Sequence, residues 1–89
     1  MTLSQLREEI DRLDGDIAAL LVQRLEICRQ VGFFKKEQGL PVSDPVREAE
    51  KCAALAAEHP EWARELAEIY ERVFAVSRGL QERITEDGT

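Results

Sequence analysis

The feature that most constrains this chain is an apolar stripe that recurs at helical spacing through residues 3–34. Its ten positions follow one another at steps of three or four residues, and no proline interrupts them. The pattern predicts one helix of about 35 residues whose stripe is a heptad seam of more than four repeats. The stripe consists of Leu3, Leu6, Ile10, Leu13, Ile17, Leu20, Arg24, Ile27, Val31 and Phe34.

Two further helices account for the rest of the chain. Gly39 and Pro41 predict the end of the first helix, and Asp44 followed by Pro45 is a typical N-cap and first helical position. We expect helices over about 3–38, 45–58 and 60–85. No segment alternates polar and apolar residues as a strand does. The predicted fold class is all-α, with residues 1–89 forming a single domain.

The length of the first helix indicates how the chain assembles. A helix of about 35 residues is roughly 50 Å long, whereas a compact chain of this size has a diameter near 30 Å. The two shorter helices cannot cover a seam of that length. We therefore expect an obligate homodimer of intertwined helices, with an elongated three-helix monomer as the alternative.

Composition excludes several classes of function. Eighteen acidic residues against twelve basic ones give a net charge of −6, so neither nucleic acid nor an anionic membrane is an expected partner. No apolar run is long enough to span a membrane, and the polar N-terminal residues do not form a secretory signal, which predicts a cytoplasmic location. Cys28, Cys52 and His59 lack metal-ligand spacing, so we expect no metal site, and no cofactor motif is present.

Two basic residues occupy positions that the helical pattern would bury. Arg24 leaves from the seam, where a guanidinium needs an anionic partner, and Lys35 lies three turns further along the same face. The small residues Cys28 and Gly32 lie between them, so the two cations could bind the ends of a small dianion. A buried ion pair at Arg24 and a solvated lysine at Lys35 would explain the same pattern.

Polar residues also mark the other two helices. Ser77 and Gln81 interrupt an apolar face of the third helix, where uncharged polar groups need buried hydrogen-bond partners. They fit either a binding site or a polar contact between helices. The second helix carries polar residues at steps of three and four, as any exposed helix would: Asp44, Arg47, Glu48 and Lys51.

Arg7 lies near the start of the first helix, away from the other candidate residues. It is about 25 Å from Arg24 along a straight helix. The two arginines can bind one small ligand only if Arg7 comes from an antiparallel partner chain. This argument is independent of the seam and again favours a homodimer.

The order and spacing of these residues resemble the all-helical class of chorismate mutases over about residues 3–84. The resemblance implies an intertwined three-helix homodimer that takes chorismate as its substrate and uses no cofactor. It is carried by LRxxIDxLDxxIxxLLxxR from Leu6 to Arg24, VGxxK from Val31 to Lys35, LPVxDxxRE from Leu40 to Glu48, and SxxxQ from Ser77 to Gln81.

The resemblance also implies a role for each catalytic candidate. Arg24, together with Arg7 of the partner chain, is expected to bind the carboxylates of the substrate. Lys35 is expected to contact a carboxylate and the ether oxygen, and Gln81 to be the second donor to that oxygen. A neutral amide at Gln81 donates without titrating.

The remaining substrate-binding candidates surround the ring of the substrate. By the same resemblance, Asp44 and Glu48 hold the ring hydroxyl, Arg47 supports the site, and Ser77 lies near the ring carboxylate. Three residues depart from the family's pattern without removing a site residue: Phe33, Phe34 and Gly79.

The predicted function is that of a chorismate mutase, an isomerase of the shikimate pathway to phenylalanine and tyrosine. The pericyclic rearrangement to prephenate needs positioning and hydrogen-bond donors rather than a nucleophile. An isochorismate pyruvate lyase or an aminodeoxychorismate mutase on the same scaffold is an alternative, against which Glu48 and Ser77 argue. A non-catalytic helical dimerisation module is another, but it leaves Arg24, Ser77 and Gln81 on apolar faces without a reason.

Overall fold

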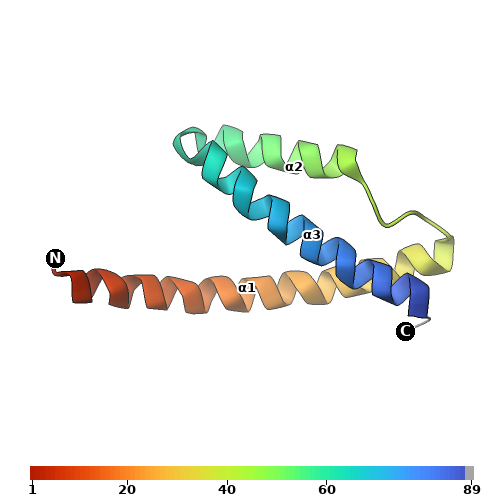
Figure 1. Ribbon diagram of the computed structural model, residues 1–89, viewed down its shortest axis with the longest axis horizontal. Coiled ribbons are helices and arrows are strands. Elements are labelled where there is room, and N and C mark those ends of the chain that lie inside the picture. The colour runs from red at the N-terminus through yellow and green to blue at the C-terminus, as the bar shows by residue number, and fades with distance from the viewer. Residues whose placement is uncertain (88–89) are drawn as a thin grey trace.

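The computed structural model describes residues 1–87, which form three α-helices and no strand (Figure 1). α1 covers Leu3–Gln38, α2 covers Pro45–Glu58, and α3 covers Ala63–Asp87 after a short 3₁₀ turn at Pro60–Trp62. The predicted all-α class with a long first helix is confirmed. Residues 88 and 89, which we expect to belong to the same domain, lie outside the described residues. None of the described helices is long and apolar enough to cross a membrane.

The end of α1 turns the chain back toward the helix. Gly39 adopts the left-handed conformation with φ 67°, which glycine reaches without a steric penalty. The Leu40 N–H donates to the Lys35 carbonyl at 2.8 Å, and the Gly39 N–H donates to the Lys36 carbonyl at 3.3 Å. This pair of bonds is a Schellman motif. It directs the loop before α2 along the last turn of α1, beside the Lys35 side chain.

The starts of α2 and α3 follow from their prolines and caps. The Asp44 carboxylate accepts a hydrogen bond from the Arg47 N–H at 3.1 Å, and Pro45 occupies the first turn, as expected. The third helical segment begins differently from the prediction. The Trp62 N–H donates to the His59 carbonyl at 3.0 Å, which makes a tight 3₁₀ turn, and regular α-helix begins only at Ala63.

Helix α3 lies between α1 and α2 and packs on both (Figure 1). Its contact with α1 is closest at Gly32, the buried glycine of α1. A Cβ atom at this position would lie 3.1 Å from Ile84 Cδ1 and 3.2 Å from Gln81 Cγ. The missing side chain therefore lets the backbone of α3 approach α1 and holds Gln81 against it.

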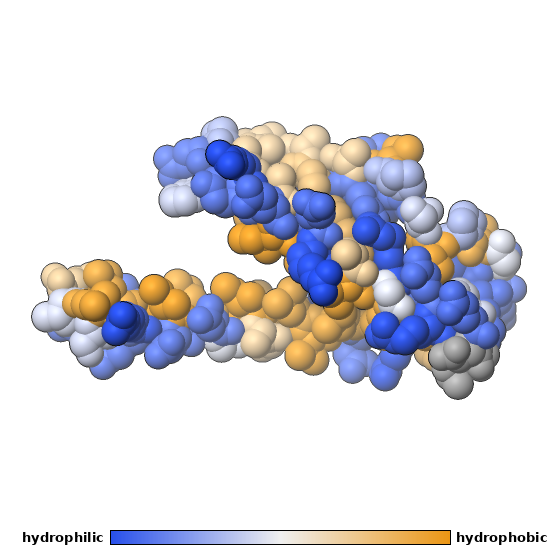
Figure 2. All heavy atoms as spheres, in the orientation of Figure 1, coloured by the Kyte–Doolittle hydropathy of each residue, from blue (hydrophilic) through white to orange (hydrophobic). Residues whose placement is uncertain are grey.

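The N-terminal part of α1 has no cover within its own chain. Residues 1–23 are all exposed, and the nine apolar members of the stripe range from 37% exposed at Val31 to 63% at Leu20. Figure 2 shows this hydrophobic surface along the arm of α1 that extends beyond α2 and α3. Among the described residues, the buried hydrophobic side chains are those of Phe74 and Ile84.

Candidate active site

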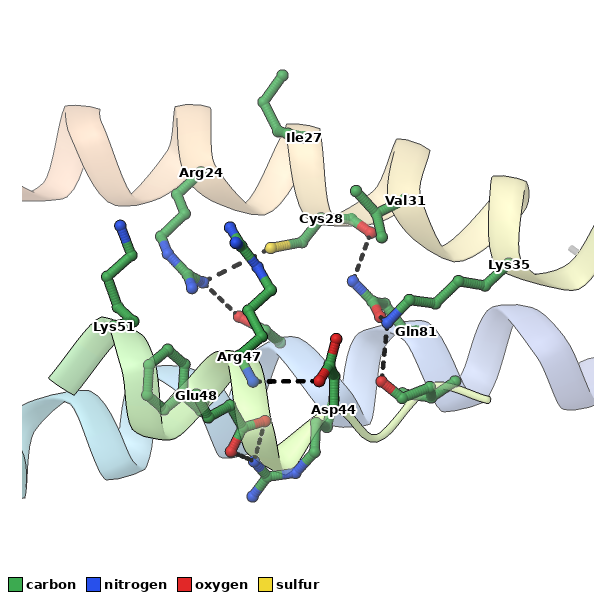
Figure 3. A pocket seen from close by; sticks show the side chains of 14 residues that line it. Arg24, Ile27, Cys28, Val31, Lys35, Asp44, Arg47, Glu48, Lys51 and Gln81 are labelled. Carbon is green, nitrogen blue, oxygen red and sulfur yellow. Dashed lines mark hydrogen bonds and ion pairs between the residues drawn. The ribbon is translucent and has the colours of Figure 1, made fainter. Parts of the chain in front are cut away.

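A cavity of about 220 Å³ opens between the C-terminal half of α1, the start of α2 and the middle of α3 (Figure 3). Side chains from all three helices and the loop before α2 line it. Seven of the eight residues predicted to bind substrate are among them. These are Arg24, Lys35, Asp44, Arg47, Glu48, Ser77 and Gln81.

Arg24 reaches from α1 to the wall formed by α3. Its Nη1 donates to Ser77 Oγ at 2.6 Å and to Cys28 Sγ at 3.5 Å, and the guanidinium lies 5.8 Å from the centre of the Phe74 ring. Within residues 1–86, no carboxylate lies within ion-pair distance of it. The buried ion pair considered from the sequence is therefore not formed in this part of the chain. The half-buried charge of Arg24 is available to an anionic ligand.

Ser77 and Gln81 are the buried polar side chains of the described residues, each 7% exposed. Ser77 Oγ donates to the Val73 carbonyl at 2.9 Å while it accepts from Arg24. Gln81 Nε2 donates to the Cys28 carbonyl of α1 at 3.0 Å. Both side chains have the buried partners that the sequence requires of them.

Lys35 and Gln81 meet at one end of the cavity. Lys35 Nζ donates to the Val42 carbonyl at 2.8 Å and to Gln81 Oε1 at 3.5 Å. An ammonium has three hydrogens and an amide nitrogen has two. One hydrogen on each side chain therefore remains for a ligand. The loop that Gly39 turns back supplies the Val42 carbonyl, so the helix end and the site are built together.

The start of α2 supplies the acidic side chains of the cavity. Asp44 caps the helix, and the Glu48 carboxylate accepts from Arg78 Nη1 of α3 at 2.5 and 2.6 Å. The charged lining has three more cations than anions, although the chain as a whole carries −6. The cations are Arg24, Lys35, Arg47, Lys51 and Arg78, against Asp44 and Glu48.

Comparison with known families finds one family model that matches most of the chain. The model of the family described as chorismate mutase type II matches residues 6–82. The chain belongs to the chorismate mutase type II family. No solved structure matches this family member.

Three relatives match this chain over different shares of their own length. The chain is 38% identical to a 3-dehydroquinate dehydratase of Pyrobaculum aerophilum over 89% of its own length and 24% of the relative's. It is 33% identical to a bifunctional chorismate mutase/prephenate dehydratase of Aquifex aeolicus, over 92% of its own length and 24% of the relative's. A chorismate mutase of Methanocaldococcus jannaschii is 26% identical over 96% of this chain and 89% of the relative. The chain thus spans about a quarter of the first two relatives and most of the third.

Three cavity contacts of this chorismate mutase type II chain were not identified from the sequence. They come from the side chains of Phe74 and Arg78 and from the carbonyl of Val42. Cys28, predicted as a small residue between Arg24 and Lys35, is half-buried and lines the cavity with its sulfur toward Arg24. The spacing of Phe74 from Ser77 and Gln81 (i, i+3, i+7) is the signal that could have found it.

Arg7 is the one predicted site residue that the cavity of its own chain does not include. It lies in the exposed N-terminal part of α1, 17 residues before Arg24. At 1.5 Å per residue this separation is about 25 Å. A role for Arg7 in the site thus requires a second chain.

Proposed function

We propose that this chain catalyses the rearrangement of chorismate to prephenate, a step in the formation of phenylalanine and tyrosine. The observation that carries the proposal is the meeting of Lys35 and Gln81, 3.5 Å apart, in a cavity with excess positive charge. Both side chains retain a hydrogen-bond donor for a ligand. The membership of the family supports the same conclusion.

The cationic lining fits a substrate with two carboxylates. Arg24 has no acidic partner in residues 1–86, so it can pair with one substrate carboxylate without breaking an ion pair in this part of the chain. Holding both ends of the dianion in a cavity of about 220 Å³ favours the compact conformation in which the reacting carbons meet. Such positioning lowers the activation free energy, because part of the entropy cost of reaching the reactive conformation is met by substrate binding.

The bond changes take place within the substrate. The ether C–O bond breaks while a C–C bond forms in one cyclic transition state, so atoms and electrons balance without a proton transfer. Negative charge grows on the ether oxygen as the bond lengthens. The free donors of Lys35 and Gln81 would stabilise that charge more strongly than they stabilise the ground state.

The proposal includes a homodimer in which Arg7 completes the site of the other chain. The accessible surface is 6969 Å², whereas a compact protein of 10.1 kDa exposes about 5,300 Å². The radius of gyration is 16.1 Å against about 12 Å for a compact chain of this length. A second copy packed along the apolar stripe would cover the excess surface and bring an Arg7 to each cavity. The cytoplasmic location expected from the sequence stays a prediction.

Product analysis tests the proposed reaction. The protein is incubated with chorismate and, separately, with isochorismate, and the products are identified by chromatography and mass spectrometry. We expect prephenate from chorismate. Pyruvate released from isochorismate, with chorismate unchanged, would instead identify a lyase on the same scaffold.

A binding measurement separates an enzyme from a dimerisation module. A bicyclic dicarboxylate that mimics the transition state should raise the melting temperature of the chain, because it binds only the folded site. A melting temperature that does not change with the ligand would contradict the proposal.

A further inference from the structure

The cavity has few groups that can accept a hydrogen bond from a neutral ligand group. Its charged side chains are mostly arginines and lysines, which only donate. Of the two carboxylates, Asp44 is exposed and already accepts from the Arg47 N–H. Glu48 is half-buried, with 27% of its side chain exposed. A substrate hydroxyl in this cavity therefore has Glu48 as its principal acceptor.

Arg78 forms an ion pair with Glu48 and so sets the net charge at that acceptor. Its Nη1 lies 2.5 and 2.6 Å from the two oxygens of Glu48 and ties the start of α2 to the middle of α3. One nitrogen serves both oxygens, so the carboxylate keeps unused lone pairs. The Arg78 side chain is 33% exposed, and its positive charge offsets the negative charge of the Glu48 carboxylate. The pair can accept from a hydroxyl but offers little net attraction to a cation.

We propose that Arg78 determines specificity at the ring substituent: it makes the Glu48 end of the cavity accept a hydroxyl and reject an ammonium. This inference rests on the proposed function and deepens it. Arg78 acts through Glu48 and is a positioning residue rather than a catalytic one. Without it, Glu48 would lose its ion-pair partner and would attract a positively charged substituent more strongly.

The test compares chorismate with its analogue that has an amino group, protonated near neutral pH, in place of the ring hydroxyl. The measured quantity is kcat/KM for the analogue divided by kcat/KM for chorismate. In R78M this ratio should rise about tenfold, because the charge of Glu48 is no longer balanced. In E48Q it should fall about tenfold, since Arg78 then faces the ammonium without a carboxylate between them.

The opposite directions of these two changes distinguish specificity from a merely structural role. Loss of packing or stability would lower both kcat/KM values and leave their ratio unchanged. In the double variant R78M/E48Q, the ratio should not rise above that of E48Q, because position 48 no longer has a carboxylate to attract the ammonium of the analogue. R83M is the matched control: it removes a positive charge from the same helix at an exposed position outside the cavity, and the ratio should stay at its wild-type value.

Failure of this inference differs from failure of the proposed function. If the wild-type protein converts chorismate and the ratio changes less than twofold in R78M, Arg78 does not determine specificity, whatever the ratio in E48Q. If the wild-type protein converts neither compound, the proposed function is wrong. The dissociation constants of the two compounds, measured by calorimetry, then test Arg78: affinity for the analogue relative to chorismate should rise in R78M and fall in E48Q. Should R78M fail to fold, R78Q, which also removes the positive charge and keeps a polar side chain, should give the same rise in the ratio.

Discussion

At the scale of single residues, burial fixes what the polar side chains of the cavity can do. Ser77 and Gln81 are both buried, and each accepts a hydrogen bond from a basic side chain that lines the cavity, Ser77 from Arg24 and Gln81 from Lys35. A buried polar group left without a partner would cost about 1–3 kcal/mol. Ser77 therefore holds Arg24, and Gln81 holds Lys35, in place before a ligand binds. Such preorganised donors are the main source of electrostatic catalysis.

Replacing Lys35 by alanine should lower kcat by about 10²–10³-fold, the usual loss for one oxyanion donor. The ether oxygen would keep only the Gln81 donor, and Gln81 Oε1 would lose the hydrogen bond from Lys35. Steady-state kinetics with chorismate measure the effect. Lys36→Ala is the matched control, because Lys36 is exposed and does not line the cavity. Normal turnover in Lys35→Ala would contradict the proposed mechanism.

The sequence predicted the side chains on the α1 face of α3 better than those on its α2 face. Ser77 and Gln81 were found because they are polar on an apolar face. Arg78 follows Ser77 at about 100° around the helix, a position that would be solvent-exposed if α3 packed on one side only. Since α3 packs on both α1 and α2, Arg78 reaches Glu48 instead. The Val42 carbonyl could not be predicted, because a backbone atom has no sequence signal.

At the scale of the helices, the helix ends were predictable and the spacing between helices was not. Asp44, Pro45 and Gly39 act locally, so their sequence context was sufficient to place the loop between α1 and α2. The contact of α1 with α3 depends instead on Gly32, which the sequence pattern predicted to leave room for a ligand between Arg24 and Lys35. That prediction is wrong for Gly32, because α3 fills the space beside it and the cavity does not include it. In the structure, Ile84 and Gln81 of α3 pack directly against Gly32, so its missing side chain sets the spacing between the two helices.

Gly32→Ala should lower kcat/KM about tenfold by moving Gln81. The added Cβ would lie 3.1 Å from Ile84 Cδ1 and 3.2 Å from Gln81 Cγ, so these side chains must give way by a few tenths of an ångström. Overpacking costs about 1–3 kcal/mol, which offsets the gain of about 1 kcal/mol from replacing a helical glycine. We therefore expect no gain in the free energy of unfolding, measured by urea denaturation.

The same substitution at Gly79 is the control. Its Cβ would meet only the flexible end of Arg83, at 3.7 Å. Gly79→Ala should stabilise the protein by about 0.5–1 kcal/mol and leave turnover near normal. An equal gain in stability at Gly32 would show that the close approach of α1 and α3 is not required.

At the scale of the whole molecule, the exposed arm of α1 is the feature that a single chain does not explain. Twenty or so helical residues without tertiary packing are marginal in water, yet residues 1–23 are all exposed within the chain. Packing of the stripe on a second copy accounts for both the helix and its apolar face. The sequence predicted this arrangement from the length of the seam, which the two shorter helices cannot cover, and independently from the distance between Arg7 and Arg24.

Leu20→Asp should dissociate or unfold the proposed dimer, because it places a charge within the stripe. Val22→Asp is the matched control on the opposite face of α1, with 58% exposure in the single chain against 63% for Leu20. Sedimentation at micromolar concentration should give wild type and Val22→Asp about twice the chain mass of 10.1 kDa. A stable, folded wild-type monomer would refute the dimer.

Subunit exchange tests whether each site combines two chains. Arg7→Ala and Arg24→Ala should each be inactive, since each removes one carboxylate-binding arginine from both sites. In a mixed dimer, one site combines the intact Arg24 of one chain with the intact Arg7 of the other, while the second site lacks both. Random exchange of equal amounts gives half mixed dimers, so activity should recover to about a quarter of the wild-type value. If Arg7 served the site of its own chain, or no site, mixing would restore nothing beyond the activities of the separate variants.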